Sequence, residues 1–418
     1  MYYDFDISDR VKELAAQAEI DCAPYFREAE ANAMEISARV LKAFRDQRVS
    51  TTDFLEVTGY GFSDPGREKL ERLYAQVFGG EDALVRAQLM SGTHALAVAF
   101  GGLLKYGDVM LSISGRPYDT MCSIIGLNGK SRNSLMAHGI KYEEIDLIDS
   151  QFDLEAIRER VSKKDVRVVA IQRSRGYAHR YSLTIDQIGE AIAVVKEADP
   201  EAIVLVDNCY GDFCETREPT HVGADVIVGS MMKNLGAGVA VTGAYCVGRT
   251  DCINDIAERF TAPCVGKDLG ANMNQLTSFY KGIFLAPATV CASLKTQIFA
   301  ARMLELAGFK GISPRYDEKR TDIVQTMDLE TPENLVKFCC GIQHSSPIDS
   351  YVTPEAGPMP GYPHDEVMAS GTFVTGATSE LSCDGPICPP YTAYMQGGLT
   401  YEYGKLGIML AIDEMLRG

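Results

Sequence analysis

The segment "GSMMKNLGAG", residues 229–238, places a single lysine, Lys233, behind a serine and two methionines and just before a run of glycines. It continues the apolar run "ADVIVGS", residues 224–230, which has the length and composition of a buried strand. An amine in an apolar setting has a lowered pKa and becomes a nucleophile suited to imine formation. The segment therefore predicts a reactive lysine at a strand end, and a surface lysine is the alternative that it leaves open.

Apolar runs of strand length recur along the chain, and helical patterns separate them. Strands are expected at 108–113, 141–147, 166–172, 202–207 and 224–230, with helices at 119–127, 153–163 and 184–197. This alternation predicts an α/β fold, in which helices cover both faces of a mostly parallel sheet and ligands bind at the carboxyl ends of the strands. A further strand is expected within 238–248, and a long helix near 287–307 is expected to act as a bridge.

The chain is expected to divide into an arm and two domains. Apolar positions at helical spacing predict two helices within residues 9–48, which form part of an N-terminal helical arm over 1–60. A large cofactor-binding domain is expected at 61–308. Residues 309–418 are richer in Gly, Pro, Cys and Tyr, and a smaller α+β domain is expected there.

Composition and charge exclude several classes of function. The 418 residues are 46% hydrophobic and 23% charged, and the formal net charge of −17 argues against DNA or RNA as the main ligand. Twelve scattered cysteines and an acidic start without an apolar signal segment indicate a cytoplasmic protein. The most apolar stretch, 282–294, is too short to cross a bilayer and is expected to be broken by Pro287, so no membrane partner is expected.

Three strand ends carry side chains suited to chemistry. Asp207 ends the run "AIVLVD", and a carboxylate behind four apolar residues needs a cationic or N–H partner. Ser91-Gly92-Thr93 opens an alanine-rich helix, whose free N–H groups and dipole suit a phosphate. Ordinary helix capping by Ser91 or Thr93 and a turn-capping role for Asp207 remain open alternatives.

One ligand accounts for the lysine, the aspartate and the helix start together, and that ligand is pyridoxal 5′-phosphate. Its aldehyde takes a lysine as an imine, its pyridine nitrogen needs an acid partner, and its phosphate needs a helix start lined with Gly and Ser. We therefore expect this cofactor to be bound by the large domain.

Several motifs together resemble a known group of enzymes. The motifs are "SGTHAL", "RPYDTM", "QRSRGY", "VDNCYGDF" and "GSMMKNLGAG". In this order they resemble the aspartate-aminotransferase fold type, its cystathionine and methionine lyase branch and, within that branch, the methionine γ-lyase-like aluminium resistance family. The resemblance covers essentially the whole chain. It implies a carbon–sulfur lyase that acts on a sulfur-containing amino acid and forms a homodimer or homotetramer with shared active sites.

The resemblance also implies roles for particular residues. Lys233 would hold the cofactor, Asp207 would pair with the pyridine nitrogen, and Tyr118 would stack on the ring. Phosphate contacts would come from Ser91, Gly92, Thr93 and Ser230, and from Tyr60 of a neighbouring subunit.

Two positions depart from the pattern of the better-known lyases. Phe62 stands where those enzymes have a phosphate-binding arginine, which Arg67 could replace. The C-terminal segment 397–410 offers no arginine for the substrate carboxylate, so Arg173 and Arg175, which follow the strand at 166–172, are the candidate clamp. A structural arginine pair that binds acidic neighbours is the alternative.

The expected reaction is an elimination in which Lys233 acts as the base at Cα and Tyr118 assists the leaving group. Aldol cleavage and transamination use the same kind of site and remain alternatives, because sequence does not show which Cα bond is aligned. A metal-tolerance protein is an alternative of another class. Its candidate ligands are Cys339, Cys340, Cys383, Cys388, His344 and His364.

Overall fold

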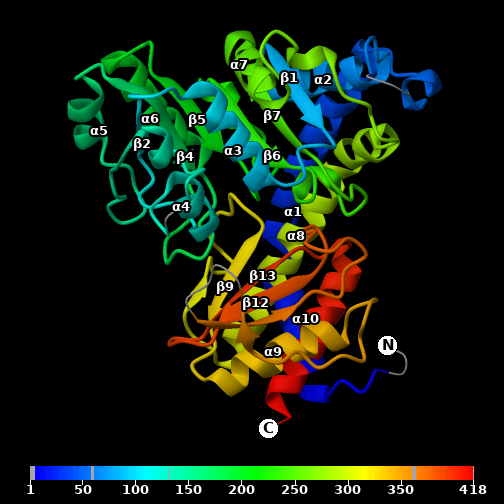
Figure 1. Ribbon diagram of the computed structural model, residues 1–418. Helices are drawn as coiled ribbons and strands as arrows, with labels where there is room; N and C mark the ends of the chain where they lie inside the picture. Colours follow the sequence, from blue (N-terminus) through cyan, green and yellow to red (C-terminus); the bar gives the residue numbers. More distant parts are fainter. Residues whose placement is uncertain (1–4, 58–60, 130, 360–363, 418) are drawn as a thin grey trace. The chain divides into compact units, whose positions relative to one another are not determined.

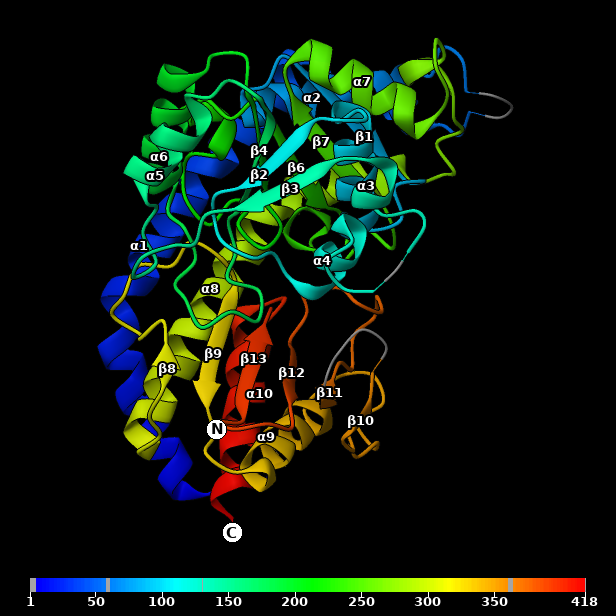
Figure 2. The same cartoon turned by 60° about the vertical axis from the view of Figure 1, so that its left-hand side comes forward.

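The computed structural model describes residues 5–57, 61–129, 131–359 and 364–417 (Figures 1 and 2). It contains two compact units, one formed by Ile36–Phe284 and the other by Met1–Glu35 together with Leu285–Gly418. These divisions differ from the expected boundaries at 60 and 308. The reason is that two long helices, α1 (Asp9–Asp46) and α8 (Leu276–Ala307), each contribute residues to both units.

The unit 36–284 contains a seven-stranded sheet that positions the candidate site. Its strand order is β1-β7-β6-β5-β4-β2-β3, and the strands from β2 to β6 are parallel. β7 is antiparallel to both its neighbours, because the short link from β6 contains no crossover helix. The expected α/β class is confirmed. The strands are β1 (Asp82–Arg86), β2 (Val109–Ser112), β3 (Lys141–Glu144), β4 (Val166–Gln172), β5 (Ile203–Asp207), β6 (Val226–Ser230) and β7 (Ala244–Gly248).

Helices cover both faces of this sheet, as Figure 1 shows. Successive side chains of β7 point to opposite faces. Cys246 packs in a cluster with residues of α3 and α7, whereas Tyr245 packs against Tyr74 and Phe78 of α2. The helices of this unit are α2 (Pro65–Phe78), α3 (Gly92–Leu103), α4 (Asp119–Ile125), α5 (Leu154–Val161), α6 (Ile185–Ala198) and α7 (Thr250–Phe260).

The N-terminal segment is one 38-residue helix, so the prediction of two helices was wrong. α1 contains Pro24, yet the buried positions Ala18, Cys22 and Phe26 continue at helical spacing on either side of it. A proline removes one hydrogen bond, but continuous packing of an apolar face can keep a long helix intact.

Pro287 likewise lies inside α8 and does not break it. The 32-residue helix is long and apolar enough to cross a bilayer by composition alone, and 72% of its most apolar window is buried within the protein. Its residues Phe299, Met303 and Leu304 belong to a hydrophobic core. This burial is typical of a core helix.

The other unit contains a six-stranded antiparallel sheet of order β10-β11-β12-β13-β9-β8. Its core includes Phe338, Met395 and Ile412, which bring α9, β13 and α10 together. A small domain with mixed helices and strands was expected in this part of the chain. Its remaining elements are β8 (Ile312–Ser313), β9 (Val324–Asp328), α9 (Pro332–His344), β10 (Gly357–Pro358), β11 (Asp365–Ala369), β12 (Ser382–Pro386), β13 (Thr392–Gln396) and α10 (Tyr401–Leu416).

Candidate active site

The carboxyl ends of three adjacent strands bring polar side chains to one edge of the sheet. Gln172 at the end of β4 is paired with Asp207 at the end of β5, and Asp207 is paired in turn with Val228 of β6. Ser230 ends β6 two residues later and is buried. Gln172, Asp207 and Ser230 therefore lie at the sheet edge where the strand pattern predicts the ligand site.

The N-terminus of α3 lies at the same edge. The Ser91 hydroxyl accepts a hydrogen bond from the backbone N–H of His94 at 3.1 Å, so Ser91 is the N-cap. Gly92 and Thr93 occupy the first two helical positions, and their N–H groups have no acceptor within the helix. A Cβ atom at Gly92 would stand 3.0 Å from Cys209 Sγ and 3.3 Å from Ser230 Cβ. The helix start, the end of β6 and the turn after β5 therefore meet closely.

Lys233 follows β6 and is partly exposed. Its Nζ lies 3.4 Å from the centre of the Tyr210 ring. Burial by itself lowers the pKa of Lys233, but Tyr210, Cys209, Asp207 and Tyr118 outweigh that effect and raise the pKa above its ordinary value. The expected lowering of this pKa is therefore wrong for the protein without a ligand, because the lysine has electron-rich and acidic neighbours rather than an apolar pocket.

Tyr118 is the N-cap residue of α4, and its ring lines a small cavity together with Met121, Gln172 and Asp207. Its backbone N–H donates to Gln172 Oε1 at 3.1 Å, which ties the start of α4 to the end of β4. Burial, with a further contribution from Asp207, raises the pKa of Tyr118. The phenol is therefore protonated at neutral pH.

Asp207 is buried, and its Oδ1 accepts a hydrogen bond from the backbone N–H of Cys209 at 3.0 Å. Burial raises the pKa of Asp207, while Lys233 and the Cys209 amide act in the opposite direction. A cationic group placed beside this carboxyl would stabilise its ionised form. The aspartate also supports its own turn, so the turn-capping alternative and the functional prediction are compatible.

Arg173 does not have the position expected of a substrate clamp. Its side chain is fully buried and forms ion pairs with Glu215 at 3.1 Å and with Glu218 at 3.4 Å. It also donates to Asn208 Oδ1 at 2.8 Å. The structural alternative therefore holds for Arg173, because a carboxylate ligand would have to displace buried acidic partners.

Arg175 has different surroundings. Its guanidinium carbon lies 5.7 Å from the centre of the Tyr181 ring, and its backbone N–H donates to Ser182 Oγ at 2.9 Å. The residue is 2% exposed. A role for Arg175 in carboxylate binding stays a prediction.

The sequence offers Tyr60, Phe62 and Arg67 for the second phosphate contact, and the structure describes the last two of them. Tyr60 lies outside the described residues, and Phe62 is exposed. Arg67 is buried, and its guanidinium donates to the backbone carbonyls of Gly270 and Asp268. These contacts commit Arg67 to the loop before α8, which does not favour a direct phosphate contact.

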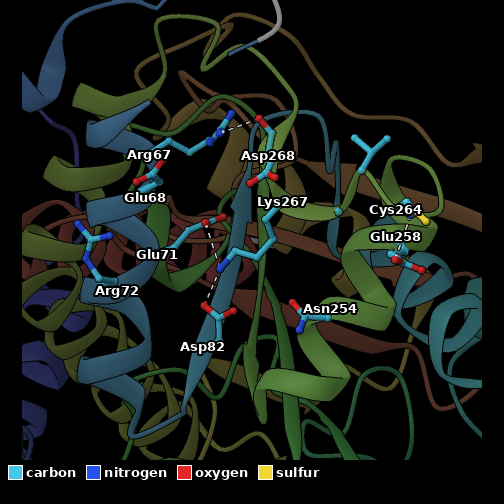
Figure 3. Close-up of a pocket in the computed structure, with 12 residues that line it drawn as sticks. Arg67, Glu68, Glu71, Arg72, Asp82, Asn254, Glu258, Cys264, Lys267 and Asp268 are labelled. Atoms are coloured by element: carbon cyan, nitrogen blue, oxygen red, sulfur yellow. Dashed lines mark hydrogen bonds and ion pairs between the residues drawn. The ribbon is translucent and has the colours of Figure 1, made fainter. Parts of the chain in front are cut away.

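Arg67 lines a separate polar cavity of about 570 Å³, which Figure 3 shows. In it the Lys267 Nζ lies 2.5 Å from Asp82 Oδ1 and 3.4 Å from Glu71 Oε2. Neither Lys233 nor Asp207 is among the residues that line this cavity. This polar cavity is therefore distinct from the predicted site.

The metal-site alternative finds little support. Among the described residues, no three His, Cys, Asp or Glu side chains are grouped so that they could hold a metal ion. Cys339 and Cys383 are buried with their sulfur atoms 3.9 Å apart, and His344 contacts Glu414 at 3.1 Å. These three expected ligands are thus committed to packing or to a surface ion pair.

Two residues that the sequence motifs did not indicate, Gln172 and Tyr210, also belong to the site. Gln172 holds the Tyr118 segment through its side chain, and the Tyr210 ring lies against Lys233. The position of Gln172 at the end of a buried strand was a usable signal. Tyr210 gave none, because its side chain reaches Lys233 through a left-handed turn.

The assembled residues fit a cofactor that carries a phosphate, an aldehyde and a basic ring nitrogen. A tight glycine at a helix start, an amine and a buried carboxyl all lie around the ends of β5 and β6. Their chemistry matches the three groups in turn: backbone N–H donors for phosphate, an amine for the aldehyde and an acid for the ring nitrogen. The residue roles themselves stay predictions.

Comparisons with known proteins give a consistent picture. A family model described as methionine gamma-lyase matches residues 11–416. The uncharacterized protein YnbB of Bacillus subtilis (strain 168) is 46% identical over 409 residues, which are 97% of each chain. A crystal structure from Clostridium novyi NT, described as a carbon–sulfur lyase involved in aluminum resistance, has 42% identity and a TM-score of 0.94, covering 97% of this chain and 96% of that one. The pyridoxal-5′-phosphate-dependent protein YhfS of Escherichia coli shares the fold alone, with 18% identity and a TM-score of 0.61. The match covers 94% of this chain and 97% of that one.

Proposed function

This chain belongs to the methionine gamma-lyase family, and on that premise we propose that it is a pyridoxal 5′-phosphate-dependent carbon–sulfur lyase. Its substrate is a sulfur-containing amino acid, and β- or γ-elimination with uptake of water releases a thiol, ammonia and a 2-oxo acid. The observation that carries the proposal is the meeting of Lys233, Asp207 and Tyr118 with the start of α3.

The residues of this chain divide the work of such a reaction. When bound, the cofactor supplies an electron sink for the charge that develops at the substrate Cα. Asp207 would keep that sink effective by offering a negative charge to the ring nitrogen. The Lys233 amine would hold the cofactor and would also be the base for the proton at Cα. Tyr118, a protonated phenol, donates toward the leaving sulfur.

The substrate carboxylate needs a cation, and Arg175 is the proposed partner because Arg173 is already paired with Glu215 and Glu218. A guanidinium can bind a carboxylate through two parallel hydrogen bonds, which lysine cannot reproduce. Arg175→Lys is therefore expected to raise KM for the amino acid more than it lowers kcat. A loss confined to kcat would assign Arg175 another role.

The proposal is tested by product analysis on purified protein loaded with the cofactor. Cysteine, cystathionine and methionine are offered separately, and 2-oxo acid, thiol and ammonia are measured. Lys233→Ala is expected to abolish product formation and the near-visible absorbance of the bound cofactor. Lys281→Ala, which changes an exposed lysine of the same unit, is the matched control and should retain both.

The products also separate the competing reactions at this site. Release of glycine from β-hydroxy amino acids identifies an aldolase, and amino transfer to a 2-oxo acid without thiol release identifies an aminotransferase. Either result, in the absence of thiol and ammonia, would overturn the carbon–sulfur lyase proposal while leaving the cofactor site in place.

A further inference from the structure

The contact between Lys233 and Tyr210 is unusually close for a cation and an aromatic ring. Lys233 Nζ lies 3.4 Å from the ring centre. The other cation–ring contacts among the described residues measure 4.6 to 6.0 Å. An ammonium over a ring face is attracted by the negative potential of that face, and the attraction strengthens when water is excluded.

The backbone holds Tyr210 in a conformation that few side chains adopt. Its φ is +67°, in the left-handed region. Its carbonyl accepts hydrogen bonds from Asn234 Nδ2 at 3.0 Å and from Cys214 Sγ at 3.4 Å. Asn234 directly follows Lys233, so the residue next to the lysine holds the backbone of Tyr210. Strained conformations of this kind persist where the surroundings over-determine them, often at functional sites.

The buried side chain of Arg173 packs against the turn that contains Tyr210. Asn208, in the same turn, accepts from Arg173 at 2.8 Å and donates to Asp212 Oδ1 at 2.9 Å. A Cβ atom at Gly211 would stand 2.6 Å from Arg173 Cδ, so the turn packs directly on the arginine. Arg173, excluded as a substrate clamp, therefore stabilises the turn that contains Tyr210.

We propose that Tyr210 is a positioning residue whose ring face holds the protonated amine of Lys233 at the reacting centre. The proposal rests on the proposed function, in which Lys233 receives the substrate proton. The ring keeps that proton-bearing amine in the site, close to the carbon from which the proton came. Tyr210 acts here through the face of its ring, above which the amine lies, rather than through its hydroxyl.

The groups around Lys233 determine the pH at which its amine is expected to lose its proton. Asp207, Cys209, Tyr118 and Tyr210 all face the amine, and together they raise the pKa of Lys233 against the effect of burial. The Tyr210 ring lies 3.4 Å from Lys233 Nζ, and because the face of an aromatic ring attracts a cation, this contact favours the ammonium form. Removing the ring should therefore let Lys233 lose its proton at a lower pH, whereas removing only the hydroxyl should not.

The test measures the protonation of Lys233 itself in full-length protein without cofactor. Trace labelling with acetic anhydride is carried out at several pH values below the raised pKa of Lys233, where the acetylation rate is proportional to the fraction of unprotonated amine. Acetylation of the Lys233 peptide is quantified by mass spectrometry against an added amine standard, and the labelling midpoint is calculated from that fraction. Tyr210→Leu is expected to move the labelling midpoint down by about one pH unit, a roughly tenfold change in the protonation equilibrium. Tyr210→Phe keeps the ring and should leave the midpoint in place. An unchanged midpoint in Tyr210→Leu, or an equal shift in both variants, would overturn the proposal.

A second measurement covers the case in which Tyr210→Leu does not fold. Phenylalanine carrying one, two or three fluorine atoms is incorporated at position 210, which keeps the shape of the ring while weakening its face potential. The midpoint should fall stepwise with fluorination, and a constant midpoint would contradict the proposal. Because the labelling needs no cofactor, its failure is distinguishable from failure of the cofactor to bind Lys233.

Discussion

At the scale of the residue, two arginines of one motif have separate environments. "QRSRGY" offers Arg173 and Arg175 as equivalent candidates, and the sequence contains no sign that Arg173 has two glutamates as partners. Those glutamates lie about forty residues downstream, on the segment after the "VDNCYGDF" turn. A pairing of this kind depends on the tertiary fold, which local patterns do not encode.

Replacing Arg173 is expected to destabilise the protein. Arg173→Met leaves Glu218 buried without its counter-ion, and breaking a buried pair in this way costs about 3–5 kcal/mol. Urea unfolding monitored by circular dichroism measures the change. Arg158→Met, which removes an exposed ion pair with Glu197, is the control and should cost less than about 1 kcal/mol. Equal small effects in both variants would contradict the structural role of Arg173.

At the scale of the element, the start of α3 is shaped for close approach. Gly92→Ala would place a methyl group 3.0 Å from Cys209 Sγ and 3.3 Å from Ser230 Cβ. We expect the phosphate cradle to be displaced and cofactor affinity to fall by tenfold or more, since about 1.4 kcal/mol corresponds to a factor of ten. The affinity is measured by titrating cofactor-free protein with pyridoxal 5′-phosphate and following the absorbance. Gly101→Ala in the same helix, where the new methyl group meets the movable side chain of Arg259, should bind normally. Unchanged affinity in Gly92→Ala would place the phosphate elsewhere.

The strand β12 carries a buried acid that makes stability depend on pH. Burial raises the pKa of Asp384 from 3.8 to about 7. Between these values the folded state binds more protons than the unfolded state, so the free energy of unfolding falls as pH rises from about 4 to about 7. The loss amounts to a few kcal/mol at most, by about 1.4 kcal/mol per pH unit. Unfolding midpoints at pH 5 and pH 8 should differ less in Asp384→Asn than in the parent. An identical pH dependence in both proteins would show that Asp384 is ionised in the folded state.

At the scale of the whole molecule, the family resemblance predicts active sites shared between subunits. If Tyr60 serves the site of a neighbouring subunit, then Lys233→Ala and Tyr60→Ala each damage a different half of one site. Mixing the two inactive variants under conditions of subunit exchange should restore about a quarter of the parent activity, because half of the dimers are mixed and each has one intact site. No recovery, despite demonstrated exchange, would place Tyr60 and Lys233 in the same subunit's site.

Much of the fold could be predicted because strand and helix periods are local. The runs that end on Gln172, Asp207 and Ser230 were all correctly expected as strands, and their parallel arrangement places those residues at one edge. The unit boundaries could not be predicted, because α1 and α8 continue through Pro24 and Pro287 and contribute residues to both units. The left-handed turn at Tyr210 was also out of reach, since a tyrosine rarely adopts that conformation without support from distant residues.

The most direct test of the central claim is to find the lysine that carries the cofactor. Protein loaded with pyridoxal 5′-phosphate is reduced with borohydride, digested and mapped by mass spectrometry. The predicted result is a single modified peptide with the cofactor mass on Lys233. Modification at another lysine, or none at all in a protein that retains its fold, would contradict the account.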